Sequence, residues 1–104
     1  MVLPKADAKD MELGIAGEAA LVLGGTKGLG FSCARQLALA GVRVAINGRD
    51  AKTGIEKAEA LGEGAIFVQG DLADNGQPAK LIAEAEHRLG AIRILITNAG
   101  GPPP

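Results

Sequence analysis

Four short apolar segments alternate with three segments of helical periodicity, and this alternation constrains the fold more than any other feature. The apolar segments, rich in Ala, Val, Leu and Ile, are 19–24, 42–48, 65–70 and 92–97. The segments between them, 29–41, 51–62 and 74–90, carry apolar residues every three or four positions, as one face of a helix does. Strands that alternate with helices predict parallel strands joined by crossover helices.

Right-handed crossovers would wind such a chain into an open sheet, so we expect an α/β, Rossmann-like, doubly wound fold. It would have about four strands in the order 3-2-1-4 and be truncated relative to a complete fold of this type. Each helix should bury one apolar stripe, although Gly54 weakens the second helix. Pro78 suits the first turn of the third helix. The expected stripes are Leu29, Cys33, Leu37 and Ala40; Ile55, Ala58 and Leu61; and Leu81, Ile82, Ala85 and Leu89.

Size and composition limit the chain to one domain of ordinary character. It has 104 residues, a net charge of -1 and no basic cluster, so nucleic-acid binding has little electrostatic support. One cysteine excludes an internal disulfide, and one histidine cannot build a metal site alone. No apolar run approaches a membrane span, and residues 1–10 are too charged for a signal peptide. We therefore expect a polar, disordered leader at 1–10, a single domain at 11–104, and a cytoplasmic location.

The first predicted strand runs directly into a glycine-rich turn, "GGTKGLG" at 24–30, and then into a helix. Gly24, Gly28 and Gly30 have the spacing G-x-x-x-G-x-G. A tight turn of this kind needs positive φ or a missing Cβ, and the helix that follows offers unpaired N–H groups to an anion. Because the turn lies between a strand and a helix in the first crossover, nucleotide binding is favoured over a turn that merely packs. The order of residues excludes a P-loop.

Four motifs in order, "LVLGGTKGLG", "INGRD", "GDLAD" and "ITNAG", resemble the N-terminal half of a short-chain dehydrogenase/reductase. The tail "NAGGPPP" resembles the branch labelled 3-oxoacyl-carrier-protein-reductase-like, and the likeness covers 11–104. The resemblance implies three groups of cofactor-binding residues. They are Gly24, Thr26, Lys27, Gly28, Leu29 and Gly30 at the phosphates and ribose; Asp71 and Leu72 beside the adenine; and Asn98, Ala99 and Gly100 after the fourth strand.

The end of the second predicted strand bears on the choice of dinucleotide. An NAD enzyme of this fold has Asp or Glu there, which accepts hydrogen bonds from the ribose 2′-OH. Here Gly48 takes that position and would leave room for a 2′-phosphate, which Arg49 could bind through two charge-assisted hydrogen bonds. The resemblance adds Lys27 as a second basic group. We therefore predict NADP rather than NAD, although Asp50 could pair with Arg49 and weaken this effect.

The catalytic groups that the resemblance implies are missing. The family uses a serine, a tyrosine that supplies a proton and a lysine that lowers the tyrosine pKa, all after the Asn-Ala-Gly motif. The 104 residues contain no tyrosine at all. We interpret His87 as a solvated helix-end residue and Cys33 as part of the core rather than as catalysts. The chain alone would then be inactive.

Several interpretations of function stay open. In the first, the chain is the NADP-binding part of an oxidoreductase that acts on a carbonyl or alcohol. In the second, it is a non-catalytic nucleotide-binding module or one chain of a split enzyme. A third, an S-adenosylmethionine-binding loop, explains neither Arg49 nor 98–100. Segment 92–97 would be an exposed apolar sheet edge, able to pair with another copy or a partner chain. The substrate cannot be predicted from these residues.

Overall fold

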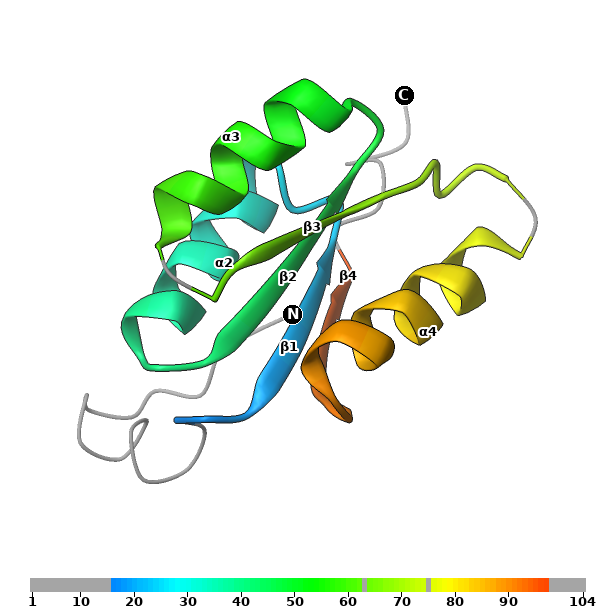
Figure 1. Ribbon diagram of the computed structural model, residues 1–104. Helices are drawn as coiled ribbons and strands as arrows, with labels where there is room; N and C mark the ends of the chain where they lie inside the picture. The colour runs from blue at the N-terminus through cyan, green and yellow to red at the C-terminus, as the bar shows by residue number, and fades with distance from the viewer. Residues whose placement is uncertain (1–15, 63, 75, 98–104) are drawn as a thin grey trace.

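The computed structural model describes residues 16–62, 64–74 and 76–97. The described chain forms one parallel sheet with the strand order β3-β2-β1-β4 and crossover helices between the strands (Figure 1). This order confirms the predicted Rossmann-like topology. The expected leader at 1–10 and the predicted site residues Asn98, Ala99 and Gly100 lie outside the described residues. The elements are β1 (Ala19–Leu23), α2 (Gly28–Leu39), β2 (Arg43–Gly48), α3 (Ala51–Leu61), β3 (Ile66–Gln69), α4 (Gln77–Leu89) and β4 (Ile92–Thr97).

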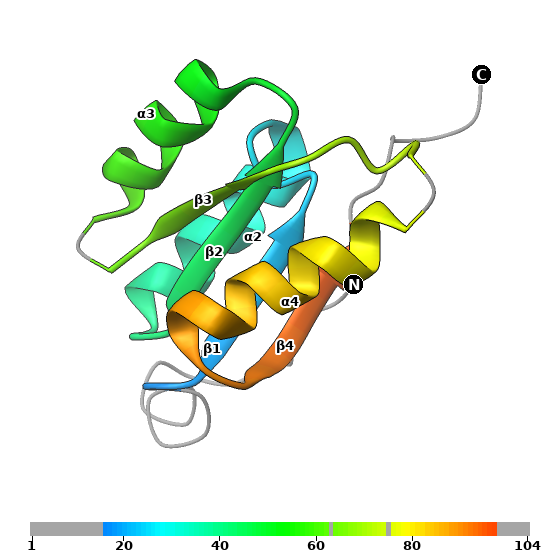
Figure 2. The ribbon, with the colours of Figure 1, turned by 45° about the vertical axis from the view of Figure 1, so that its right-hand side comes forward.

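The helices cover both faces of the sheet, with α2 and α3 on one face and α4 on the other (Figure 2). Because side chains alternate along a strand, β1 supplies both layers of the core. Ala20 and Val22 pack toward α2 and α3, whereas Leu21 packs toward α4. All five residues of β1 are buried. A strand covered on both faces reads as a continuous apolar run, as it does here.

The stripe predicted for α2 is partly wrong. Leu29 is 76% exposed, and the residues that α2 buries are Gly30, Ala34 and Leu37. The buried face is therefore shifted by one position, toward small residues that let the helix lie close to the sheet. Cys33 is half-buried against the core. The stripe of α3 is also narrower than predicted, because Ile55 is 52% exposed while Ala58 is buried.

The glycine that weakened the prediction of α3 has a packing role. A Cβ at Gly54 would overlap the ring of Phe67 on β3. The glycine therefore lets α3 approach the sheet where that ring lies. Three of the four residues predicted for the stripe of α4 are buried, namely Leu81, Ala85 and Leu89, and Ile82 is partly buried against the same layer of the core.

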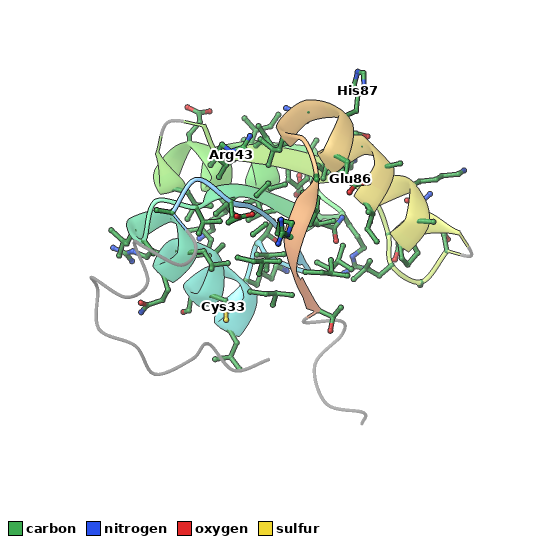
Figure 3. The ribbon with its side chains drawn as sticks, turned by 90° about the horizontal axis from the view of Figure 1, so that it is seen from below. Cys33, Arg43, Glu86 and His87 are labelled. Carbon is green, nitrogen blue, oxygen red and sulfur yellow. The ribbon has the colours of Figure 1, made fainter. Side chains whose placement is uncertain are left out.

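The amino ends of the strands are held together by side chains. On β2, Arg43 donates from Nε to the Gly17 carbonyl oxygen over 3.2 Å and from Nη1 to the Leu89 carbonyl oxygen. Glu86 accepts a hydrogen bond from the Ile92 amide at 3.2 Å, where α4 turns into β4. Figure 3 views Arg43 and Glu86 from this end and shows His87 pointing away from the body of the molecule. Among the described helices, none is both long enough and apolar enough to cross a bilayer.

Candidate functional site

The turn after β1 leaves backbone N–H groups without helical partners. Gly24 and Gly28 have φ of 68° and 52°, a region that residues with a side chain rarely adopt. Helix α2 begins at Gly28, and its first intrahelical bond runs from the Phe31 amide to the Lys27 carbonyl oxygen at 3.3 Å. The amides of residues 28–30 therefore precede the helical ladder, and the side chain of the N-cap residue Lys27 makes no capping hydrogen bond. These amides and the helix dipole favour an anion.

The same turn sits tightly on the sheet through Gly25, which the sequence analysis did not single out. A Cβ on Gly25 would lie 2.8 Å from the Val22 carbonyl oxygen and 3.1 Å from Ile46 Cβ. The Gly25 amide donates to the Asn47 carbonyl oxygen at 2.9 Å. A side chain at this position would push the turn away from β1 and β2. The doubled glycine after a buried strand was the available signal.

Asn47 organises three strand ends and was also missed. It is 1% exposed and the only buried polar residue among the described ones. Its Oδ1 accepts from the Gly24 amide at 3.1 Å, and its Nδ2 donates to the carbonyl oxygens of Val68 and Gly70 at 3.1 and 3.2 Å. One amide side chain thus ties the turn after β1 to the end of β3. An asparagine in an otherwise apolar strand could have indicated this role.

A groove of about 560 Å³ lies at the carboxyl ends of β1, β2 and β3. Its lining includes the predicted site residues Gly24, Thr26, Lys27, Arg49, Asp71 and Leu72. Asn47, Gly48, Asp50, Thr53, Gly70 and Ala73 complete it. Gly28, Leu29 and Gly30, which were predicted with them, do not line it: Gly30 is on the buried face of α2, and Leu29 is exposed to solvent. In open α/β sheets, ligands bind outside the carboxyl ends of the strands, and this groove lies at that place.

The absence of a side chain at Gly48 is explained by packing, which the sequence did not lead us to expect. A Cβ on Gly48 would lie 2.7 Å from Thr26 Cγ2 and 3.0 Å from its Oγ1. The space beside Gly48 is therefore filled by Thr26, which corrects the expectation that the missing side chain simply leaves room for a phosphate. In either interpretation the last residue of β2, Gly48, brings no acidic side chain to this position.

Two basic and two acidic side chains line the groove. Asp50 does not pair with Arg49, because its carboxylate caps α3. Oδ1 accepts from the amides of Lys52 and Thr53 at 2.9 and 3.3 Å. The other carboxylate, that of Asp71, accepts from the Ala73 amide at 2.9 Å. The guanidinium of Arg49 makes no hydrogen bond or ion pair with the residues that the structure describes, and its backbone carbonyl oxygen accepts from Gln69 Nε2 at 3.0 Å.

Other candidate positions lie elsewhere. Neither His87 nor Cys33 lines the groove. A second concavity of about 450 Å³ lies along the outer edge of β3, between α3 and α4, away from the glycine turn. Within 16–62, 64–74 and 76–97, no cluster of three His, Cys, Asp or Glu could hold a metal ion.

A parallel α/β sheet with a glycine turn at its first crossover, and a groove at the carboxyl ends of its strands, defines the Rossmann class of nucleotide-binding folds. The family model for short chain dehydrogenase matches residues 18–104. The chain belongs to the short-chain dehydrogenase/reductase family.

Individual relatives agree with this assignment. The (+)-neomenthol dehydrogenase of Capsicum annuum is 40% identical over 88 residues, which are 78% of this chain and 28% of the relative. The NADP-dependent (R)-specific alcohol dehydrogenase of Lentilactobacillus kefiri is 34% identical over 88 residues, with 83% and 35% covered. A crystal structure of actinorhodin polyketide ketoreductase with NADPH superposes with a TM-score of 0.75 at 32% identity, with 82% and 34% covered.

The ketoreductase likeness agrees with the branch expected from the sequence. The chain spans about a third of the length of the alcohol dehydrogenase and of the ketoreductase, and 28% of the neomenthol dehydrogenase.

Proposed function

We propose that residues 11–104 form a partial dinucleotide-binding domain that binds NADP in the groove at the carboxyl ends of β1, β2 and β3. The observation that carries this proposal is the groove itself, where the glycine turn meets Lys27 and Arg49. In the whole protein, this domain would serve an oxidoreductase that acts on a carbonyl or alcohol. A cytoplasmic location stays a prediction from the sequence.

The residues present fit the group. Gly24 and Gly25 keep side chains away from the point where the turn meets the sheet, and a Cβ on Gly25 would collide with backbone. Thr26 and Lys27 would face the phosphates, Arg49 a 2′-phosphate, and Asp71 and Leu72 the adenine. The bound nicotinamide would supply hydride chemistry. Residues 98–100, expected to complete the site, belong to the same proposal.

The charges at the end of β2 support NADP over NAD. An NAD site of this fold has an acidic residue there that would repel a 2′-phosphate. Gly48 stands at that position, and Arg49, whose guanidinium is unengaged by described residues, follows it. The alcohol dehydrogenase relative is named as NADP-dependent, and the ketoreductase structure contains NADPH. Both observations support the choice of NADP over NAD, and titration of the Arg49→Gln variant tests it.

Calorimetric titration of the 104-residue chain with NADP and with NAD tests the proposal. Charge-assisted hydrogen bonds to a phosphate are strong, so Arg49→Gln should weaken NADP binding about tenfold and leave NAD binding within about twofold. Arg35→Gln is the matched control, because Arg35 is an exposed arginine on α2 that does not line the groove. It should change neither affinity.

The proposal fails if the chain binds neither dinucleotide, or if Arg49→Gln weakens both by the same factor. Hydride transfer is a separate claim. The chain contains no tyrosine, so the family's proton donor would have to come from polypeptide outside these residues. We expect NADP binding without turnover of carbonyl substrates, and robust NADPH oxidation by the pure chain would contradict this.

We further propose that the free edge of β4 receives a strand from additional polypeptide. Within the described residues β4 pairs with β1 alone, and Leu95 is 45% exposed. An unpaired apolar edge is a template for strand addition. Light scattering should detect concentration-dependent association of the chain, which Leu95→Lys should reduce. A monomer at all concentrations would exclude a second copy and leave a different chain as the partner to seek.

A further inference from the structure

The groove that we assign to NADP contains acidic side chains, whose negative charge opposes the binding of this cofactor's phosphates. Besides Lys27 and Arg49, it is lined by Asp50 and Asp71. Carboxylates are negatively charged at neutral pH, so these four side chains sum to zero. A site whose charges cancel gains less from an additional phosphate on its ligand than a site of net positive charge does. The preference for NADP then depends on which of the two carboxylates lies near the 2′-phosphate.

Asp50 is the carboxylate placed to do so. It directly follows Arg49, and both lie where β2 ends and α3 begins. Asp71, in contrast, follows β3 and is the residue expected beside the adenine. Asp50 is fixed in position, because Oδ1 accepts from the Lys52 and Thr53 amides and Oδ2 accepts from Thr53 Oγ1 at 3.3 Å.

This capping has a second effect on an incoming phosphate. The first-turn amides of a helix attract anions, and a phosphate beside Arg49 could use those of α3. Asp50 already satisfies the amides of Lys52 and Thr53. The carboxylate therefore removes two donors from the end of the groove as well as adding a negative charge. Both effects disfavour a 2′-phosphate, and neither disfavours a ribose hydroxyl.

We infer that Asp50 is a specificity-determining residue that keeps the preference of this groove for NADP over NAD narrow. The inference rests on the proposed function. Asp50 stays useful to the fold because Asp is among the best N-cap residues, so its cost to NADP binding accompanies a gain in the stability of α3. Asn caps a helix as well as Asp does and carries no charge, so Asp50→Asn separates the two roles.

The test compares two adenosine nucleotides that differ only in the 2′-phosphate. Adenosine 2′,5′-bisphosphate and adenosine 5′-monophosphate are titrated into the 104-residue chain, and the ratio of their dissociation constants is the readout. Asp50→Asn should raise the preference for the bisphosphate about fivefold, as removal of one nearby charge in a solvent-exposed groove does. The increase should shrink between about 50 mM and about 500 mM salt, because salt screens exposed charges.

Glu56→Gln is the matched control. Glu56 is an exposed acidic residue on the same helix, and it does not line the groove. It should change the ratio less than about twofold if the effect is local rather than one of net charge. Asp50→Ser, a second uncharged capping variant, should reproduce Asp50→Asn, and circular dichroism checks that both stay folded.

The outcomes separate the two proposals. If wild type binds the nucleotides and the folded Asp50 variants leave the ratio unchanged, the inference about Asp50 is overturned while the dinucleotide site stands. If Glu56→Gln moves the ratio as far as Asp50→Asn, the effect is global and the inference is again overturned. If wild type binds neither nucleotide, the proposed function fails and the inference fails with it.

Discussion

The two ends of the sheet differ in the residues that form them: polar side chains at the amino end, and glycines at the carboxyl end. At the amino end, side chains close the structure: Arg43 joins the backbone near residue 17 to the end of α4, and Glu86 binds the first amide of β4. At the carboxyl end, glycines at 24 and 25 hold side chains away, and the start of α2 has no side-chain cap. The polar side chains of the amino end are engaged in internal hydrogen bonds, whereas at the carboxyl end the amides of residues 28–30, at the start of α2, have no helical partner.

This difference assigns different consequences to mutation at each end. A change at the amino end should alter the free energy of unfolding and leave ligand affinity intact, because the groove proposed to bind the ligand lies at the other end of the strands. A change at the carboxyl end should alter both quantities, since the turn that would meet the cofactor also packs on β1 and β2. Asn47 is the point where the two quantities are most tightly joined, because it is buried and yet holds Gly24.

The largest effect should therefore come from Asn47→Leu. The change leaves the Gly24 amide and the carbonyl oxygens of Val68 and Gly70 without their partner, so the free energy of unfolding should fall by about 3 kcal/mol. NADP affinity should fall with it. Urea denaturation and calorimetry measure the two changes.

The neighbouring change Ile46→Val controls for the loss of packing in the same buried strand. It removes one methylene group and should cost about 1 kcal/mol without loss of NADP affinity. An Asn47→Leu variant as stable as wild type would show that water replaces the amide, and the coupling between stability and ligand affinity at this residue would then be weak.

Gly25→Ala should have the next largest effect, and it can be compared with a change at the first residue of α2. The new Cβ would meet the Val22 carbonyl oxygen, which is backbone and cannot turn aside, so the turn must shift. We expect a loss of about 2 kcal/mol in unfolding free energy together with weaker NADP binding.

Gly28→Ala is the comparison, because its Cβ would meet nothing within 4 Å. Its φ of 52° alone is unfavourable, which costs about 1 kcal/mol. If Gly28→Ala were as damaging as Gly25→Ala, conformation rather than space would govern the turn, and the packing account of Gly25 would be wrong.

Much of the fold followed from the sequence because parallel strands with crossover helices have a strong pattern. The strands and helices lie within a few residues of the predicted ranges, and the order 3-2-1-4 was predicted correctly. The exposed positions of Leu29 and Ile55 were not, because periodicity shows that a stripe exists but not which small residues let the helix come close. Gly30 and Ala34 took the buried place that Leu29 was given.

The candidate site shows the same limit. Residues in motifs, such as Lys27 and Arg49, were found because a motif names them. Asn47 and the cap formed by Asp50 were missed because their roles depend on partners more than twenty residues away or on the exact start of a helix. The pairing of Asp50 with Arg49, which adjacency suggested, does not occur among the described residues, since the amides of Lys52 and Thr53 donate to the Asp50 carboxylate instead.

Arg43→Met should have the smallest effect and is the sharpest test of the contrast between the ends. Methionine keeps the aliphatic length but loses both hydrogen bonds to the carbonyl oxygens of Gly17 and Leu89. Arg43 is largely exposed, so water can replace part of what is lost, and the free energy of unfolding should fall by about 1 kcal/mol. The ratio of NADP to NAD affinity should not move, because the arginine lies at the end of β2 opposite to the groove.

Arg35→Met, which removes an arginine that bonds to none of the described residues, should leave both measurements unchanged. A shifted affinity ratio in Arg43→Met would mean that the amino end is coupled to the groove through β2. The two ends would then not have separate roles in stability and in ligand binding.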